Sequence, residues 1–216
     1  MKRESSAATR RPRGRPRAFD RDRALDRAME VFWEKGFEAA SVSDLTRAMG
    51  INPPSLYAAF GDKERLFLEA VERYVSHRAE SCDYCGEATA KESVRKLLTY
   101  VAEEMTSPGR PHGCLMMMAT TTTTAASPQL QAALAKLRAA SRQKLRERIA
   151  RGVTDGELPA DTDPSALAAF YGTVLAGMAA MAHEGTTRKA LLATVEAAMR
   201  SWPEKEKRAA RAKVAA

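Results

Sequence analysis

The stretch FWEKGFEAASVSDLTRAMGINPPSLYAAFGDKERLF, residues 32–67, decides the fold because it holds several helix boundaries in close succession. Gly36 ends a first helix, since glycine adopts a left-handed backbone at a helix C-terminus without steric penalty. Ser41 begins a second helix, with Asp44 three residues later in capping-box spacing. Gly50 ends that second helix after only two turns.

A third short helix follows at once. Asn52 caps it, Pro53 occupies a first-turn position where a missing N–H costs nothing, and Gly61 breaks it. The turn at 50–52 joins the second and third helices, with glycine allowing the reversal and Ile51 burying between them. Two short helices joined in this way predict a helix-turn-helix, whose last helix fits the major groove of DNA.

Similar signals on both sides of this stretch predict about nine helices and no strand. Ala, Leu, Glu, Arg and Lys dominate the composition, which favours helix. The other expected helices cover 20–35, 62–80, 89–105, 114–126, 127–151, 163–183 and 187–202. The predicted fold class is therefore all-α, with an N-terminal three-helix DNA-binding domain and a C-terminal helical domain.

Composition divides the chain further. Residues 1–18 are rich in Arg, Pro, Ser and Gly without apolar periodicity, so we expect a disordered basic arm. The helix-turn-helix domain and its connecting fourth helix take 19–80. The sequence SCDYCGEA at 81–88 is interpreted as a linker that opens a second domain over 81–203. A basic tail, 204–216, follows.

The net charge of +8 is concentrated at the ends of the chain. Residues 1–23 hold nine Lys and Arg against three Asp and Glu, and the tail is also cationic, whereas the body is close to neutral. Such a distribution indicates contact with a polyanion at one place. For the tail, a role in solubility alone is the competing explanation.

Three cysteines and no signal peptide predict a reducing, cytoplasmic location. No apolar run approaches the roughly 20 residues of a membrane span, so no membrane partner is expected. The longest candidate, 164–182, is interpreted as a buried helix.

Residues 17–66 resemble the TetR family of bacterial regulators. The matching features are KGF after the first helix, a Ser/Thr-rich start to the second, the pattern A-x-x-x-G-I-x-x-x-S-L-Y-x-x-F and the following D-K-E-x-L. Residues 89–202 resemble the family only in helix number and length.

The resemblance implies DNA-contacting roles for particular side chains. Tyr57 and Lys63 would contact phosphates, and Ser41 would bind the DNA backbone at the start of the second helix, where free N–H groups also favour an anion. The competing explanations are packing of Tyr57 against the first helix and a solvated surface role for Lys63. Base reading would fall to Ser43, Asn52, Pro53 and Ser55.

The arm contains the sequence Arg-Gly-Arg-Pro-Arg at 13–17, which resembles an AT-hook. We expect Arg13 and Arg15, with Arg17 beside them, to enter the minor groove next to the major-groove site, because narrow minor grooves attract arginine. Diffuse attraction to phosphates is the alternative.

The resemblance also implies an effector pocket and dimerisation through the last two helices, so that 81–203 is the effector-binding and dimerisation domain. The effector is an unknown, mostly apolar small molecule, and no cofactor is expected. Adaptable and aromatic side chains predict the pocket wall at Tyr100, Met105, Met116, Met117, Phe170 and Tyr171. Membership of the ordinary core is the alternative for each.

A stripe of small residues on the 164–183 helix predicts the face of a homodimer, with packing inside the chain as the alternative. The expected interface residues are Ala168, Gly172, Leu175, Ala176 and Met178, with Leu192 and Val195 from the last helix.

Cys82-x-x-Cys85 invites a zinc or thiol-sensing hypothesis, but a closed zinc site needs four ligands, and His112 and Cys114 would complete one only if folding brought them near. We therefore expect no metal. The three histidines are scattered, and no phosphate loop or nucleophile motif is present, so an enzyme is not expected.

The predicted function is that of a sequence-specific transcription regulator. It would be a homodimeric repressor that binds a palindromic DNA operator and is released by a small molecule. An architectural DNA-binding protein without sequence preference is the alternative, which the basic arm alone could suggest.

Overall fold

The computed structural model describes residues 20–205, and within that range the chain forms nine α-helices, one short 3-10 helix and no strand. The all-α fold class is thus confirmed. The helices are α1 (Arg21–Ala39), α2 (Val42–Met49), α3 (Pro53–Phe60), α4 (Lys63–Ser81), α5 (Ala90–Glu104), α6 (Leu115–Thr121), α7 (Pro128–Thr154), α8 (Pro164–His183) and α9 (Arg188–Met199), with the 3-10 helix η1 at Tyr84–Gly86.

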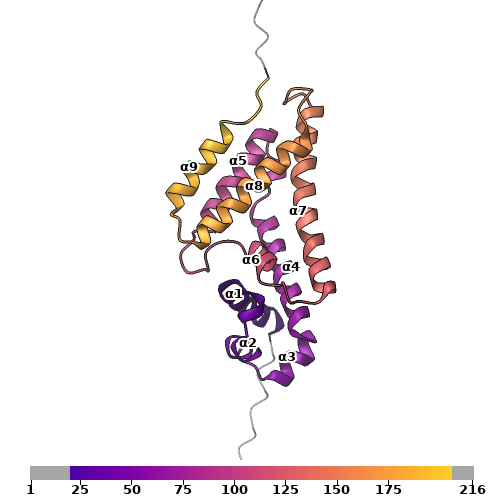
Figure 1. Ribbon diagram of the computed structural model, residues 1–216, viewed down its shortest axis with the longest axis vertical. Coiled ribbons are helices and arrows are strands. Elements are labelled where there is room, and N and C mark those ends of the chain that lie inside the picture. The colour runs from indigo at the N-terminus through magenta and orange to yellow at the C-terminus, as the bar shows by residue number, and fades with distance from the viewer. Residues whose placement is uncertain (1–19, 206–216) are drawn as a thin grey trace, which may run out of the picture.

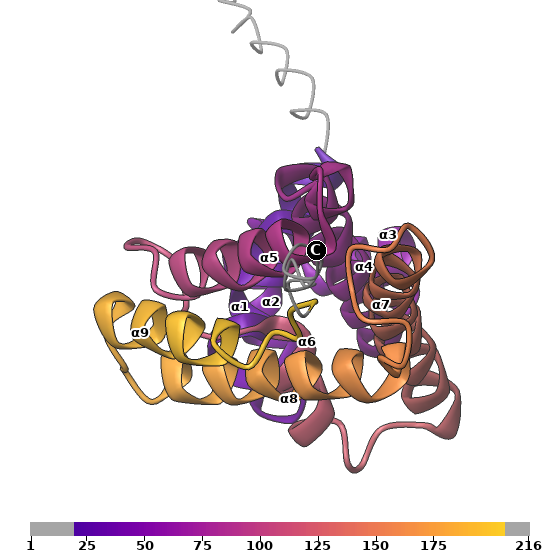
Figure 2. The ribbon, with the colours of Figure 1, turned by 90° about the horizontal axis from the view of Figure 1, so that it is seen from above.

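The molecule is elongated, with α1, α2 and α3 gathered at one end and α5, α7, α8 and α9 at the other (Figure 1). Helix α4 runs from the first group towards the second, and α6 lies between them. Seen along the long axis, α8 and α9 lie next to each other on one side (Figure 2), and they also contact each other directly.

Capping side chains begin nearly every helix where the sequence predicted. Ser41 and Asp44 form a complete capping box at α2, and Thr89 and Glu92 form another at α5. Each reciprocal pair satisfies two N–H groups that would otherwise lack a partner. Side-chain caps also begin α1, α3, α4, α7, α8 and α9, from Asp20, Asn52, Asp62, Ser127, Asp163 and Thr187.

The first helix is interrupted at Gly36, as predicted, but the chain resumes a helical path as far as Ala39. Gly36 has a φ of 78°, a conformation that side-chain-bearing residues rarely adopt. The break turns Phe37 back into the core, where its ring lies 5.0 Å from that of Phe67. Phe32 joins the same cluster in an edge-on arrangement at 4.9 Å from Phe67.

The segment 81–88, interpreted from sequence as a linker, alternates between exposed and buried residues. Cys82 and Tyr84 are buried, and the backbone carbonyl of Glu87 accepts a hydrogen bond from buried Arg148 on α7 at 3.3 Å. The segment is therefore packed against the C-terminal helices. Its polar composition concealed this, because Cys82 and Tyr84 are its only buried side chains.

Helix α8 is less buried than the sequence suggested. By length and composition it is the one helix within residues 20–205 that could cross a membrane, and only 28% of its most apolar window is buried inside the chain. The interpretation as a buried helix is wrong for the single chain. One side of α8 packs on α5, α7 and α9, and the opposite side is open.

Candidate DNA interface and effector cavity

The turn between α2 and α3 is built around Gly50, which adopts a left-handed conformation with φ 70° and ψ 31°. The N–H of Ile51 then donates to the carbonyl oxygen of Thr46 at 3.1 Å, closing the end of α2. Leu45 and Leu56 face the interior and are fully buried. Local turn chemistry and core packing together fix the angle at which α3 leaves the domain.

The open side of this helix pair carries five of the seven described residues that were predicted to contact DNA. Ser41, Ser43, Asn52, Pro53 and Tyr57 are exposed, with Tyr57 at 49% of its maximal surface. About half of the Tyr57 surface is therefore open to solvent and available to a phosphate.

The other predicted DNA contacts are placed differently. Ser55 and Lys63 are half-buried. Arg13, Arg15 and Arg17 lie outside the described residues.

The start of α2 is held by an electrostatic cluster. The Asp44 carboxylate accepts a hydrogen bond from the Ser41 hydroxyl at 2.8 Å and pairs with the Lys35 ammonium at 3.0 Å. The hydrogen bonds from Ser41 and then from Lys35 lower the pKa of Asp44 to about 2. Because Ser41 is engaged in this capping box, its exposed position is fixed before any DNA approaches.

Lys63 is engaged within the protein. Its ammonium lies 4.7 Å from the centre of the Phe37 ring and donates to the carbonyl oxygen of Glu38 at 3.4 Å. Burial lowers the pKa of Lys63, and the nearby Glu38 carboxylate opposes that shift. Contact with a phosphate would have to use the remaining donors of the Lys63 ammonium or displace it from Phe37 and Glu38.

Sequence reasoning missed two arginines of this domain. The Arg47 side chain is 79% exposed on α2, and its nearest carboxylate, that of Asp44, is 4.0 Å away. Such a residue is available to a phosphate. The signal was a basic residue on the polar face of the helix before the turn.

Arg21, the second missed residue, positions the end of α3. Its guanidinium lies 4.4 Å from the centre of the Phe60 ring, donates to the carbonyl oxygen of Ala59 at 3.3 Å, and pairs with Glu69 of α4 at 2.7 Å. One side chain thus connects the beginning of α1, the end of α3 and the middle of α4. No local pattern predicts such a contact.

Residues 122–127, after α6, bind the DNA-binding helices. The Thr124 hydroxyl and the Ala125 N–H both donate to the Glu38 carboxylate, at 2.9 and 3.0 Å, and the hydrogen bond from Ala125 is the main cause of the lowered pKa of Glu38. The Ser127 N–H donates to the Glu64 carboxylate of α4 at 2.8 Å. The threonine-rich run therefore joins the C-terminal helices to both α1 and α4.

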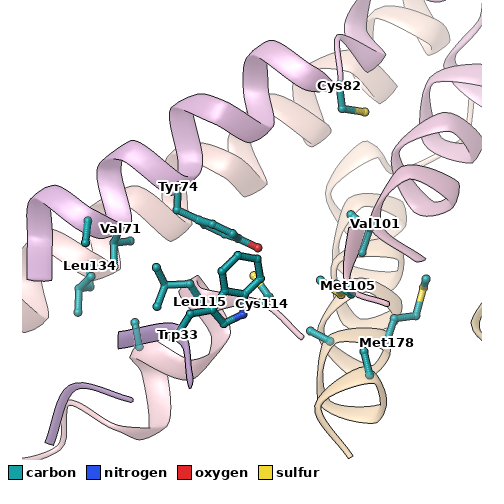
Figure 3. Packing of buried hydrophobic residues seen from close by; sticks show 14 of the residues in the cluster. Trp33, Val71, Tyr74, Cys82, Val101, Met105, Cys114, Leu115, Leu134 and Met178 are labelled. Atoms are coloured by element: carbon teal, nitrogen blue, oxygen red, sulfur yellow. The ribbon is translucent and has the colours of Figure 1, made fainter. Parts of the chain in front are cut away.

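A cavity of about 920 Å³ opens where α1, α4, α5 and the loop after α5 meet. Trp33, Tyr74, Arg78 and Tyr100 contribute to its wall, and Trp33 and Tyr74 pack edge-on with ring centres 4.9 Å apart (Figure 3). Burial raises the pKa of Tyr74 well above its ordinary value, so its hydroxyl stays neutral. The volume lies in the range of about 300–1,000 Å³ usual for small-molecule sites.

The cavity differs from the pocket that the sequence predicted. Only Tyr100, among the six predicted residues, lies in its wall. Met105 and Tyr171 belong to the core, and the Tyr171 hydroxyl donates to the carbonyl oxygen of Ala198 at 3.3 Å. Met117 and Phe170 are exposed and Met116 is half-buried. Apolar composition does not distinguish a cavity wall from a core, which explains the difference.

The open side of α8 and α9 carries small and apolar residues. Phe170, Thr173, Gly177 and Met181 are exposed in helical spacing on α8. Exposed small residues on α9 are Ala190, Ala193, Thr194 and Ala197.

The interface residues predicted from sequence divide between the two sides of these helices. Ala168, Met178 and Val195 are buried within the chain and do not belong to this open face, which corrects that part of the expectation. Gly172, Leu175, Ala176 and Leu192 are half-buried.

The cysteines do not gather at one point. Cys82 and Cys114 are buried and Cys85 is half-buried, and all three are free thiols. The Cys114 sulfur accepts a hydrogen bond from Arg78 at 3.4 Å. Within residues 20–205 no group of three His, Cys, Asp or Glu side chains has an arrangement able to hold a metal ion.

An exposed recognition helix on a fixed helix-turn-helix, joined to a larger helical domain, defines a DNA-binding transcription regulator. Residues 24–70 match the family model for bacterial regulatory proteins of the tetR family, and residues 90–199 match the tetracyclin repressor-like C-terminal domain. The chain belongs to the TetR family of transcriptional regulators and is not an enzyme. Regulators of this family act on DNA in the cytoplasm and bind small-molecule effectors through the C-terminal domain.

Individual relatives are similar over nearly the whole chain. The HTH-type transcriptional repressor ComR of Escherichia coli K12 is 34% identical over 207 residues, which are 94% of this chain and 99% of ComR. The transcriptional repressor BdcR of the same organism is 32% identical over a match that covers 84% of this chain and 88% of BdcR. A solved structure of the regulator CifR, with cysteine substitutions and bound to 26-base-pair operator DNA, is 48% identical, covers 88% of this chain and 100% of CifR, and has a TM-score of 0.82.

Proposed function

We propose that the protein is a homodimeric repressor that binds a palindromic operator and is released from it by a small-molecule effector. The exposed face of α2 and α3, held at a fixed angle by Gly50 and the buried Leu45 and Leu56, is the observation that carries this proposal. The relatives ComR and BdcR are repressors, and CifR has been solved on its operator, which supports the same direction of regulation.

On this proposal the DNA contacts divide by chemistry. Tyr57, Lys63, Arg47 and the Ser41 region hold phosphates and set the position of α3. Base edges are read by Ser43, Asn52, Pro53 and Ser55. Since this face carries few long polar side chains, methyl contacts and DNA shape contribute to specificity.

The arm would add contacts outside the major groove. Arg13, Arg15 and Arg17 would enter an adjacent minor groove, and the protein would associate with the nucleoid through its DNA.

We further propose that the open face of α8 and α9 joins two copies of the chain. Small residues such as Gly177 and Ala193 allow two helices to approach closely, and Phe170 and Met181 supply apolar area. Half-buried Gly172, Leu175, Ala176 and Leu192 would border this contact. The dimer would place two α3 helices about 34–36 Å apart, as two successive half-sites require.

The proposed domain limits follow from these assignments of DNA binding and dimerisation. We assign 1–18 to the arm, 19–80 to the DNA-binding domain with α4, 81–203 to the effector and dimerisation domain, and 204–216 to the tail. Residues 122–127 would carry effector-induced shifts to the DNA-binding helices, because they contact both α1 and α4.

The test is operator selection from genomic fragments, followed by fluorescence anisotropy against bulk competitor DNA. The proposal expects one palindromic sequence to survive competition, and expects Tyr57→Phe to weaken its binding about tenfold per copy of the chain, the value of one hydrogen bond to a charged group. Because Tyr57 is exposed, the thermal midpoint of the variant should equal that of the wild type. Equal competition by every DNA would favour the architectural alternative.

A further inference from the structure

One arginine in the wall of the cavity has no acidic partner. The Nη1 atom of Arg78 donates to the Tyr74 hydroxyl at 3.2 Å and to the Cys114 sulfur at 3.4 Å, and neither group is a carboxylate. Within residues 20–205, no ion pair within 4.0 Å joins Arg78 to an acidic side chain. The positive charge of this half-buried guanidinium is therefore not balanced by the protein.

The other charges around the cavity are balanced or solvated. Three of the acidic wall residues pair with arginines, namely Asp26 with Arg73, Glu30 with Arg27 and Glu104 with Arg110. The remaining two acidic wall residues, Glu34 and Glu80, are exposed, where water screens them. An incoming anion would thus meet two unpaired but solvent-exposed carboxylates, those of Glu34 and Glu80, and one unbalanced cation in the wall.

The groups beside Arg78 are flat and aromatic. Its guanidinium carbon lies 5.5 Å from the centre of the Tyr74 ring and 6.0 Å from that of Tyr100. Trp33 faces Tyr74 and is 5% exposed, and its indole N–H is buried without a hydrogen-bond partner in the described part of the chain. Figure 3 shows Trp33, Tyr74 and Cys114 gathered at one point between α1, α4 and α6.

We propose that this cavity binds a small organic anion, a carboxylate carried on a flat unsaturated body, with Arg78 as its ion-pair partner. A guanidinium matches a carboxylate with two parallel hydrogen bonds, and the rings of Tyr74 and Tyr100 match a flat body. A cationic ligand would be repelled by Arg78, and a neutral one would leave its charge unbalanced.

The inference rests on the effector-responsive function proposed above and adds a route to the DNA-binding helices. Trp33 and Met29 of α1 form part of the cavity wall. A ligand between α1 and Arg78 of α4 therefore contacts the DNA-binding domain itself. Its entry would move α1 relative to α4, which also carries Lys63 at its start.

The test uses the full-length protein labelled with 5-fluorotryptophan, because the chain has two tryptophans and only Trp33 lies at the cavity. Benzoate, cinnamate and phenylacetate are titrated beside their neutral amides and beside benzylammonium, and the fluorine spectrum is recorded. At least one carboxylate should shift the Trp33 signal saturably and leave that of Trp202 in place. The amide of that carboxylate and benzylammonium should bind at least about tenfold more weakly than the carboxylate.

Two variants locate the charge. Arg78→Gln should weaken carboxylate binding at least about tenfold, whereas Arg110→Gln, which removes a cavity arginine already paired with Glu104, should leave it within about twofold. Arg78→Lys should keep part of the affinity because it keeps the charge. Should Arg78→Gln fail to fold, the preference of the wild type for carboxylate over amide decides the matter alone.

Operator affinity measured in the same samples separates this inference from the function on which it rests. The anion site is refuted, and the regulator remains, if an amide releases the operator as well as its carboxylate does. The same holds if no carboxylate moves the Trp33 signal of a protein that binds its operator specifically. If the unliganded protein prefers no DNA sequence, the proposed function fails whatever the Trp33 signal does.

Discussion

The hydroxyl oxygen of Thr122, just after α6, accepts a hydrogen bond from the backbone N–H of Phe37 in α1, with 3.1 Å between N and Oγ1. The methyl group of the same threonine occupies the space beside Gly36, so that a Cβ at Gly36 would lie 2.6 Å from its Cγ2 atom. Two segments that lie 85 residues apart are thus fitted to each other at the break in α1.

Gly36→Ala is predicted to lower the free energy of unfolding by more than about 1 kcal/mol, because it combines a positive φ with a steric overlap. Gly109→Ala is the matched control, since Gly109 has the same φ of 78° and no neighbouring atom within 4 Å of the place that an alanine methyl group would take. Urea unfolding measures both. Equal losses of unfolding free energy in the two variants would mean that the Thr122 side chain moves aside at no cost.

Lys63→Met is predicted to weaken operator binding and to make it less sensitive to salt. Each lost phosphate contact should reduce the slope of log affinity against log salt by roughly 0.9 per copy of the chain. Lys189→Met, a change at an exposed residue on α9, is the control and should leave the slope unchanged. An unaltered slope for Lys63→Met would show that Lys63 stays on Phe37 in the complex.

Arg21 and Glu69 are predicted to act as a pair in positioning α3. Arg21→Gln and Glu69→Gln should each reduce operator affinity. The first change removes the guanidinium over Phe60, and the second removes the carboxylate that holds it there. The double variant should be no weaker than the worse single one. Anisotropy measurements decide, and a loss confined to Arg21→Gln would indicate a direct DNA contact by Arg21.

The start of α2 is predicted to loosen in acid. The hydrogen bonds from Ser41 and Lys35 lower the pKa of Asp44 from 3.8 to about 2, so the folded state favours its carboxylate. Its stabilising contribution is complete above a pH of about 4 and is lost as the pH falls towards 2. Amide exchange in α2 between pH 6 and 2 should show this loss. Asp44→Asn should flatten the dependence in that window.

Local signals in the sequence were enough for most helices of the fold, but the helix expected over 114–126 ends at Thr121. Asp20, Ser41 and Asn52 cap the helices that they were predicted to cap, because a cap depends on residues within one turn. The DNA-contacting role of Tyr57 came only from the family resemblance, and its exposure in the structure is compatible with that role.

Contacts between distant segments escaped prediction. The cavity takes Trp33, Arg78 and Tyr100 from three helices, and no pattern within one of them marks a wall. On α8, small residues occur on all sides, so periodicity could not show that Ala168 faces inwards and Gly177 outwards. The threonine run could not be interpreted until its partners Glu38 and Phe37 were in place.

The contact between Arg21 and the end of α3 also determines where the basic arm starts. Asp20 immediately precedes Arg21, whose guanidinium touches Ala59, so the chain joins the fold beside the last turn of the groove-facing helix. Arg15 is five residues before Asp20, and five residues span at most about 18 Å. Arg15 and Arg17 therefore cannot lie farther than about 18 Å from Asp20, which limits them to DNA close to α3.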